Sequence, residues 1–157
     1  GLYENKKIKG PIHLSGNNES QLIKIFKKIK KNDWVFTGWR NHYHALLKGL
    51  DLKFVEKKII QGKSMNISSI NKKFFSSSIV GGVIPIALGV AYAIKKKKLN
   101  YKVWVFIGDM TYETGIFHEA YKYYWKRIRD RNATLKFRVK FFVSSHGTRL
   151  VSSVLIC

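Results

Sequence analysis

Apolar residues in the first third of the chain recur with the period of an α-helix. Between Glu19 and Lys31 most of the lysines lie off a single apolar stripe, which consists of Leu22, Ile23, Phe26 and Ile29. The pattern predicts a helix over 19–31, a short strand over 33–37, and helices over 43–48 and 52–61. Segment 62–78 has no period and is rich in Ser, Asn and Lys, so we expect a long loop there.

The second half of the chain alternates more regularly. Small and apolar residues predict a helix over 81–98, and a nearly continuous Val-rich run predicts a buried strand over 101–107. A helix over 111–129 and a strand over 135–143 follow. This alternation is typical of an α/β fold in which helices flank a parallel sheet.

The charge of the chain is strongly basic. Its 157 residues include 30 Lys plus Arg against 9 Asp plus Glu, which gives a formal net charge of +21. Such a charge is typical of proteins that bind nucleic acid or an anionic membrane surface. The basic residues are nevertheless spread through nearly every segment, and only Lys95 to Lys98 form an unbroken run, which is more typical of a solvated helix end. A basic nucleic-acid-binding module is therefore the alternative and not the first hypothesis.

Other features of the composition bound the class of protein. With 45% hydrophobic residues the chain can build a core and is no disordered tail. The single cysteine, Cys157, excludes a disulfide within the chain and fits a reducing compartment. No apolar stretch approaches the roughly 18 to 20 residues of a membrane-spanning helix. Because the sequence starts at Gly1 without a signal-peptide pattern, we expect its amino end to be cut within a longer protein.

An acidic residue stands where open α/β folds bind their ligands. Asp109 follows the predicted buried strand through Gly108 and precedes a helix, at the carboxyl edge of the sheet. Its carboxylate could hold Mg²⁺ and bridge to a diphosphate. It could equally cap the next helix by accepting backbone N–H bonds. Taken without other information, the residues favour the cap.

A basic cluster follows the first predicted strand, in the segment from Thr37 to His44. The guanidinium of Arg40 offers a planar fork for phosphate oxygens. His42 and His44 can move protons near neutral pH. A basic loop with one core-facing histidine is the alternative, but three such groups within five residues favour a site. His13 is a weaker candidate.

Paired glycines open the long helix of the second half. Gly81 and Gly82, in the segment from Ser76 to Pro85, would let the backbone approach a ligand and leave its amides free. Close packing of the helix alone would also require them. The sequence has neither a Walker lysine loop nor a Gly-x-Gly-x-x-Gly pattern.

Taken in order, five segments resemble the alpha subunit of the thiamine diphosphate-dependent 2-oxo acid dehydrogenases. These enzymes are the decarboxylating first component of the pyruvate, branched-chain and acetoin dehydrogenase complexes. The resemblance runs from about Lys9 to Phe137, and although each segment is weak by itself, five in one order at compatible spacing are specific. The segments are Gly10 to Ser15 with Glu19, Arg40 to Asp51, Gly62 to Met65, Ser78 to Ala87, and Gly108-Asp109 followed by Glu113, Gly115 and Phe117 to Ala120.

The resemblance implies the thiamine diphosphate-binding fold and a role for each matching residue. Asp109 matches the Mg²⁺-binding Asp of a Gly-Asp-Gly motif, so a metal ligand replaces the helix cap as our expectation. Arg40 matches the residue that contacts the cofactor diphosphate, and Trp39 stands where another aromatic residue or a His is usual. His42 matches the active-site histidine, and His13 a histidine near the substrate channel. The other expected cofactor contacts are Ile79, Val80, Gly81, Gly82 and Gly108.

The resemblance also implies a reaction and its partners. The reaction is oxidative decarboxylation of a 2-oxo acid with thiamine diphosphate and Mg²⁺, and the acyl unit passes to the lipoyl group of an acyltransferase component. Because a beta subunit supplies the carboxylate that activates the cofactor, we expect a heterotetramer and no activity from this chain alone. We expect a cytoplasmic location, or the mitochondrial matrix in a eukaryote, and neither a membrane nor a specific nucleic acid as partner. A transketolase-like thiamine enzyme is a further alternative, but we identify no acceptor-phosphate site for it.

The sequence departs from the family pattern at several positions. Met110 replaces the last residue of Gly-Asp-Gly, Asn17 and Asn18 replace Gly-Gln, and Asn66 stands where a His is frequent. A larger departure is the missing Glu-Asn-Asn or Glu-Asp-Asn motif at the end of the next strand, whose Asn is a metal ligand in the family. We therefore expect weak binding of Mg²⁺.

A shift of reading frame would explain the missing motif. Codons for Arg138 to Phe142 can be chosen so that reading one base later gives Glu-Ser-Asn-Phe. We expect a truncated cofactor-binding domain over 1–137 and, over 138–157, a tail that is either frameshifted or divergent. The coding DNA tests the choice, because a shifted frame must continue with family-like sequence.

Overall fold

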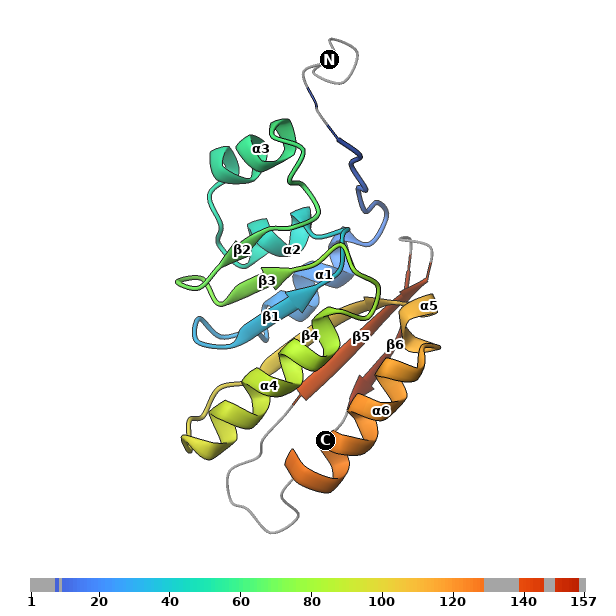
Figure 1. Cartoon of the computed structure of the whole chain (residues 1–157). Coiled ribbons are helices and arrows are strands. Elements are labelled where there is room, and N and C mark those ends of the chain that lie inside the picture. The colour runs from blue at the N-terminus through green and yellow to red at the C-terminus, as the bar shows by residue number, and fades with distance from the viewer. Residues whose placement is uncertain (1–7, 9, 129–138, 146–148, 156–157) are drawn as a thin grey trace.

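The fold is an α/β sheet with helices on both faces (Figure 1). The computed structural model describes residues 8, 10–128, 139–145 and 149–155, and side chains as far as residue 126. The strands are β1 (Trp34–Thr37), β2 (Ser68–Ser69), β3 (Phe74–Ser76), β4 (Val103–Gly108), β5 (Val139–Ser145) and β6 (Arg149–Leu155). The helices are α1 (Glu19–Phe26), α2 (His42–Leu47), α3 (Leu52–Ile60), α4 (Val83–Lys96), α5 (Asp109–Tyr112) and α6 (Gly115–Tyr123), followed by the π-helical turn η1 (Tyr124–Ile128).

The sheet has the order β2-β3-β1-β4-β5-β6. The four central strands are parallel, as the alternation of elements predicted. The two outer strands, β2 and β6, pair antiparallel with β3 and β5, so the sheet as a whole is mixed. In the centre, Trp34 pairs with Val103 and Thr37 with Phe106, which brings the carboxyl ends of β1 and β4 to one edge.

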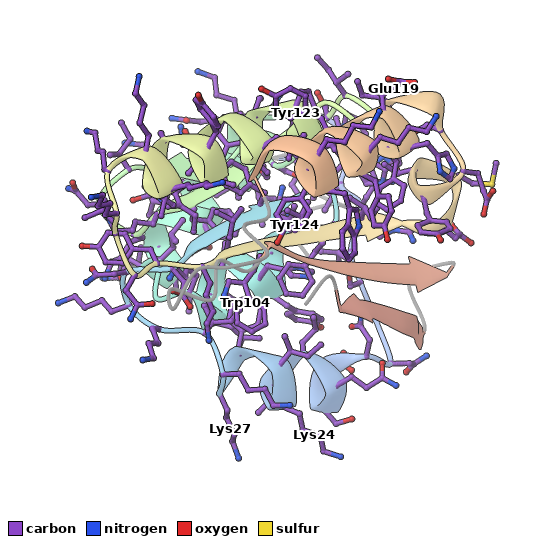
Figure 2. All side chains as sticks on the ribbon, turned by 90° about the horizontal axis from the view of Figure 1, so that it is seen from below. Lys24, Lys27, Trp104, Glu119, Tyr123 and Tyr124 are labelled. Atoms are coloured by element: carbon purple, nitrogen blue, oxygen red, sulfur yellow. The ribbon has the colours of Figure 1, made fainter. Side chains whose placement is uncertain are left out.

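Side chains alternate along β4 between two hydrophobic clusters. Val103, Val105 and Ile107 lie in the cluster that α4 and α6 complete. Trp104 and Phe106 lie in the other, which α1, α2 and α3 complete. Figure 2 shows the sheet between these helical layers. The prediction that this strand is buried on both faces is therefore confirmed.

Two predicted helices are shorter than the sequence pattern indicated. The first ends at Phe26, because the N–H of Lys28 and of Ile29 bond three residues back and tighten the chain into a turn. The predicted helix over 111–129 is divided into α5, α6 and η1. The division between α5 and α6 falls at Thr114, whose ψ of 147° is extended and whose hydroxyl donates to the carbonyl of Thr111 at 2.6 Å.

The predicted loop over 62–78 contains strands. The prediction was wrong for β2 and β3, since β3 pairs in parallel with β1 near the middle of the sheet. Three residues are too few for a two-residue period to be visible in the sequence. The burial of Phe74 and Ser76 holds this short strand in place.

The last predicted strand, over 135–143, is observed as β5 at 139–145, where it pairs with β4. Residues 135–138 lie outside the described residues. The division into a domain over 1–137 and a tail over 138–157 stays a prediction, which the coding DNA tests. Within the described part of the chain, no helix has both the length and the apolar character to cross a membrane.

Candidate functional site

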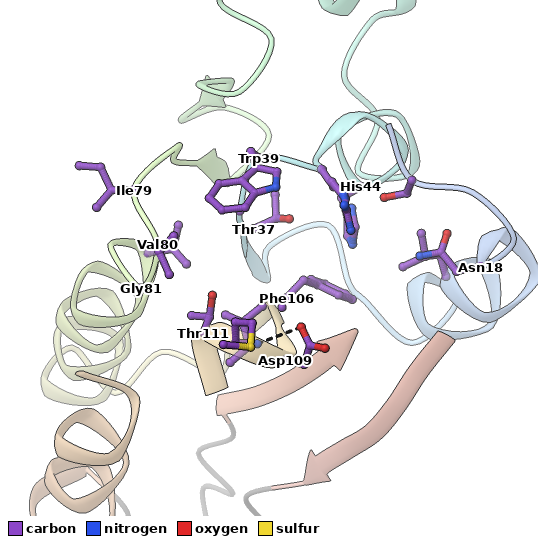
Figure 3. Close-up of a pocket in the computed structure, with 18 residues that line it drawn as sticks. Asn18, Thr37, Trp39, His44, Ile79, Val80, Gly81, Phe106, Asp109 and Thr111 are labelled. Carbon is purple, nitrogen blue, oxygen red and sulfur yellow. Dashed lines mark hydrogen bonds between the residues drawn. The ribbon is translucent and has the colours of Figure 1, made fainter. Parts of the chain in front are cut away.

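A pocket with a volume of about 290 Å³ opens at the carboxyl ends of β1 and β4 (Figure 3). This is the edge where open α/β sheets bind ligands. Its walls come from segments that are far apart in the sequence: Ser15, Asn18, Leu22, Thr37, Gly38, Trp39, Arg40, His44, Ile79, Val80, Gly81, Val83, Phe106, Ile107, Gly108, Asp109, Met110 and Thr111.

Asn41 fixes the segment that brings Arg40 to the pocket. It is fully buried and caps α2 by position, yet its side chain makes no capping bond. Its amide instead donates to the carbonyls of Ser64 at 3.0 Å and Met65 at 3.2 Å, and to the hydroxyl of Ser76 at 3.0 Å. One side chain therefore ties the start of α2 to the 62–67 segment and to β3.

A chain of hydrogen bonds leads from β3 to the glycine-rich wall of the pocket. The N–H of Ser77 donates to the carbonyl of Thr37, and the N–H of Ser78 to Asn66 Oδ1. The N–H of Ile79 then donates to Ser77 Oγ at 3.1 Å. The Thr37 segment and the Ile79 segment are thus linked through Ser77, by one backbone–backbone bond and one bond to its hydroxyl.

Any side chain at Gly81 would be strained. Its φ of +75° is in the left-handed region, and a Cβ on it would stand 2.6 Å from Cγ2 of Ile116. The pocket wall is therefore bare backbone at this position. Gly82 lies behind it as the N-cap of α4 and does not line the pocket.

Asp109 is the first residue of α5, and Gly108 is the N-cap. Its carboxylate accepts a bond from the N–H of Met110 at 2.9 Å, so it satisfies a backbone donor at the helix start (Figure 3). Asp109 also lines the pocket. In the described part of the chain, no group of three or more His, Cys, Asp or Glu is placed to hold a metal ion.

Two buried histidines stand on α2. Burial lowers the pKa of His42. Burial also lowers the pKa of His44 to about 4, an effect that the backbone of Arg40 opposes and His42 reinforces. The ring of His44 meets that of Phe106 edge-on, with centroids 4.5 Å apart. Both imidazoles are therefore neutral near pH 7.

Several buried polar atoms beside the pocket have no hydrogen-bond partner among the described residues. They include Asn18 Oδ1, Arg40 Nε and both ring nitrogens of His42. Leaving such an atom unpaired costs about 1 to 3 kcal/mol, so folded proteins rarely do so without a functional reason. These atoms indicate that the region takes a polar ligand.

The structure brings together seven of the ten residues expected to form the site. They are Trp39, Arg40, Ile79, Val80, Gly81, Gly108 and Asp109. Three do not line the pocket. His42 is buried beside it, Gly82 lies behind Gly81, and His13 is exposed with its ring 5.9 Å from that of Trp39.

Sequence reasoning did not assign Asn18 or Phe106 to the site, and it gave His44 no separate role. Both Asn18 and His44 line the pocket at its α1 and α2 side (Figure 3). The signal for His44 was its place in the basic cluster, where spacing alone does not tell which histidine reaches the pocket. Asn18 is one of two residues that replace the family's Gly-Gln. This departure marked the position but did not indicate a role for the side chain.

Large apolar side chains are exposed at the mouth of the pocket. Ile79 is 70% exposed, Val80 50% and Met110 74%. Such residues are commonly covered in the working form of a protein.

Comparison with known proteins agrees with this architecture. The sequence profile of the family described as dehydrogenase E1 component matches residues 1–123. The chain belongs to this family. The alpha-subunit resemblance carried by the five sequence segments is thereby confirmed.

Three relatives share one name, pyruvate dehydrogenase E1 component subunit alpha. The chain is 32% identical over 130 residues to the subunit of Rickettsia prowazekii. This aligned region covers 76% of the present chain and 40% of the relative. The mitochondrial subunit of Dictyostelium discoideum is 29% identical over 77% of this chain and 34% of its own length. That of Zymomonas mobilis is 28% identical over 98% of this chain and 44% of its own. The chain thus spans less than half the length of these relatives.

Proposed function

We propose that this chain is the thiamine diphosphate-binding portion of a pyruvate-type E1 alpha subunit. In the whole enzyme it would serve the oxidative decarboxylation of a 2-oxo acid and transfer of the acyl unit to a lipoyl group. One observation carries the proposal. Three separate segments, around Arg40, Gly81 and Asp109, were matched to cofactor contacts by sequence, and all three line one pocket.

The residues of the pocket suit a diphosphate and a ring system. Arg40 would bind phosphate oxygens, because its buried Nε lacks a partner among the described residues and its guanidinium is a fork of fixed donors. Ile79, Val80 and the bare backbone of Gly81 would pack against the organic part of the cofactor, which a side chain at Gly81 would obstruct. Trp39 adds a flat apolar wall.

Asp109 would hold Mg²⁺ against the diphosphate, since carboxylate oxygen is a preferred ligand of that ion. The described residues supply no cluster of further acidic or histidine ligands near it. We therefore propose that the chain binds Mg²⁺ weakly without the rest of the enzyme. When bound, thiamine diphosphate would supply the ring that accepts the electrons left behind when carbon dioxide departs.

His42 would hold or move a proton beside the reacting centre. Its lowered pKa makes it neutral at pH 7, and a neutral imidazole can both donate and accept a hydrogen bond. Neither nitrogen is engaged within the described residues, so both are available. His13 lies outside, against Trp39, where it would meet a substrate that enters the pocket.

A partner subunit would complete the site. The exposed apolar side chains at the pocket mouth support a beta subunit that covers it and contributes the carboxylate that activates the cofactor. The chain alone would then be inactive. The acyl acceptor would be a lipoyl acyltransferase component, and the compartment the bacterial cytoplasm or the mitochondrial matrix.

Calorimetric titration of the purified chain with thiamine diphosphate and Mg²⁺ tests the cofactor site. We expect weak binding, and weaker binding of thiamine, which lacks the phosphates that Arg40 would contact. Arg40→Ala should lower the affinity for thiamine diphosphate about tenfold, the loss of one charge-assisted contact. Lys24→Ala, which removes a cation on the outer side of α1, should leave it unchanged (Figure 2). Equal affinities of the two variants would contradict the proposed site.

Co-expression with the beta subunit of a relative tests the covered mouth. Ile79→Asp should prevent a stable complex, whereas Leu52→Asp, at a side chain of similar exposure on α3, should leave it intact. If both variants co-purify with the beta subunit, the pocket mouth is not the interface.

A further inference from the structure

Lysines are concentrated at the amino ends of the central strands, at the opposite end of these strands from the pocket. The strands β3, β1 and β4 are neighbours and parallel, so the segments that lead into them lie side by side. Figure 1 shows these segments on one side of the molecule, away from α5. Their lysines, here called the basic edge, are Lys27, Lys28, Lys30, Lys31, Lys72, Lys73, Lys95, Lys96, Lys97, Lys98 and Lys102.

The basic edge is dispersed in the sequence but gathered by the fold. The N–H of Trp34 donates to the carbonyl of Lys102 at 2.8 Å, which ties the start of β1 to the segment before β4. Lys48 at the end of α2 reaches the same place, because its Nζ donates to the carbonyl of Lys30 at 3.0 Å and to that of Lys31 at 3.2 Å. The spread of lysines along the chain therefore does not exclude a polyanion as partner.

The positive charge of the basic edge is not balanced locally. Asp33 is the acidic residue of these segments, and it is 1% exposed and accepts bonds from Lys30, Lys102 and Trp104. Most lysines of the basic edge are exposed. The other acidic residues in the described part of the chain lie outside these segments and are Glu19, Asp51, Glu56, Asp109, Glu113 and Glu119. The edge thus presents a strong positive potential to solvent.

The aromatic rings at this edge indicate which kind of polyanion fits. The Nζ of Lys73 stands 5.8 Å from the ring centroid of Trp34 and 5.7 Å from that of Tyr101. Both rings are half-buried, so a lysine covers them where an unstacked base would need an open aromatic face. This arrangement favours a duplex, whose bases are already stacked, over a single strand.

The side chains of the basic edge also suit a backbone more than base edges or lipid. All its cations are lysines, which are point charges, whereas arginine provides the fork that reads guanine. Exposed large apolar residues are few in these segments, with Ile70 in one and Leu99 in another. A membrane-bound surface needs a broader apolar face beside its cations.

We propose that the basic edge binds the phosphate backbone of a nucleic-acid duplex without reading its sequence. The amino ends of three neighbouring strands span about 10 Å, since strands lie about 4.8 Å apart. A duplex carries one negative charge per roughly 1.7 Å of its axis, so about six phosphates would face this span. The proposal is independent of the proposed enzyme activity, because the pocket lies at the carboxyl ends of the strands.

Fluorescence anisotropy of a labelled DNA duplex of about 20 base pairs measures binding by the purified chain at pH 7. The affinity should fall about a thousandfold between 50 and 200 mM salt, as for about six neutralised phosphates. A duplex of different sequence should bind equally well, and a large preference for one sequence would contradict backbone binding. An RNA duplex of the same length distinguishes the two sources of such a backbone.

Two variants of equal net charge separate the basic edge from the total charge. Lys31→Gln with Lys97→Gln removes one exposed lysine from each of two adjacent segments, and Lys57→Gln with Lys63→Gln removes two exposed lysines on α3 and just after it. The first pair should weaken duplex binding about tenfold or more and reduce the slope of log K against log salt by about two. The second pair should change the affinity less than threefold. Thermal unfolding checks that both variants are folded.

Equal losses in the two variants would overturn the proposal, since total charge would then explain the binding. Tighter binding of a single strand than of the duplex would also overturn it. So would binding to vesicles of phosphatidylcholine with 30% phosphatidylglycerol when the duplex is not bound. Thiamine diphosphate at constant ionic strength should not displace the duplex, and displacement would place the duplex in the pocket and not on the basic edge.

Discussion

Buried polar groups at the two ends of the central strands differ in their hydrogen bonding. At the amino ends of β1 and β4, the buried Asp33 accepts three hydrogen bonds, one of them from the indole of Trp104. At the carboxyl ends, atoms of Asn18 and Arg40 in the pocket and of His42 beside it have no partners among the described residues. The same two strands therefore have one closed end and one open end.

This difference separates stability from binding. A buried carboxylate with three donors stabilises the fold and has most of its acceptor positions occupied. Buried donors and acceptors that lack partners cost stability and are available to a ligand. The predictions below test whether the two ends behave in this way.

The largest effect should come from the closed end. Asp33→Ala leaves the N–H groups of Lys30 and Lys102 and the indole of Trp104 unpaired, and should lower the free energy of unfolding by about 4 kcal/mol. Urea unfolding followed by circular dichroism measures it. The control is Asp51→Ala, which removes one exposed capping bond to Phe54 N and should cost about 1 kcal/mol. Equal losses for the two variants would mean that Asp33 is no special anchor.

The open end should lose stability in acid. The pKa of His44 is about 4 in the folded chain against 6.5 ordinarily, so the unfolded state binds more protons between these values. Stability should be complete above pH 6.5 and fall by about 3 kcal/mol as the pH drops to 4, with His42 adding in the same direction.

Urea unfolding across this pH range provides the measurement. His44→Phe should flatten the dependence on pH, because it removes the imidazole that must be protonated. His118→Gln, at an exposed position on α6, should not. An unchanged slope in the His44 variant would show that other groups control the acid response.

A smaller effect should follow from the glycine wall of the pocket. Gly81→Ala should cost about 1 to 2 kcal/mol, because φ is +75° and the new methyl meets Ile116. Gly89→Ala, inside α4 with open space around it, should instead stabilise the chain by about 0.5 to 1 kcal/mol. Thermal unfolding of both variants distinguishes them, and a shift of the same sign would contradict the strained geometry of Gly81.

Helices and strands with a long apolar pattern could be predicted from the sequence, whereas strands of two or three residues could not. The five consecutive apolar residues of β4 form a continuous buried run, and the fourteen residues of α4 carry a repeating apolar pattern, so both elements are visible in the sequence. The three residues of β3 are not, since their position depends on pairing with β1, which is distant in the sequence.

The candidate site residues that could be predicted are those that lie at the end of a strand or the start of a helix. Arg40, Gly81 and Asp109 follow strands or precede helices, so order along the chain placed them at the same edge of the sheet. His42 and His44 are two residues apart on α2, and only their packing decides that His44 lines the pocket. The orientation of Asn18 likewise depends on the way in which α1 packs on β4.

The positions of the tryptophans allow the two ends of the central strands to be distinguished by fluorescence. Trp104 is 1% exposed and hydrogen-bonded at the closed end, whereas Trp39 is partly exposed at the open end. Indole emission shifts to longer wavelength in water, and only an accessible indole is quenched by dissolved iodide. With the partly exposed Trp34 and Trp125 replaced by Phe, emission lost to iodide would report the pocket, and the shielded emission would be that of the anchored strand ends. Binding of a ligand in the pocket and unfolding of the anchored strand ends could then be followed in one sample without an added label.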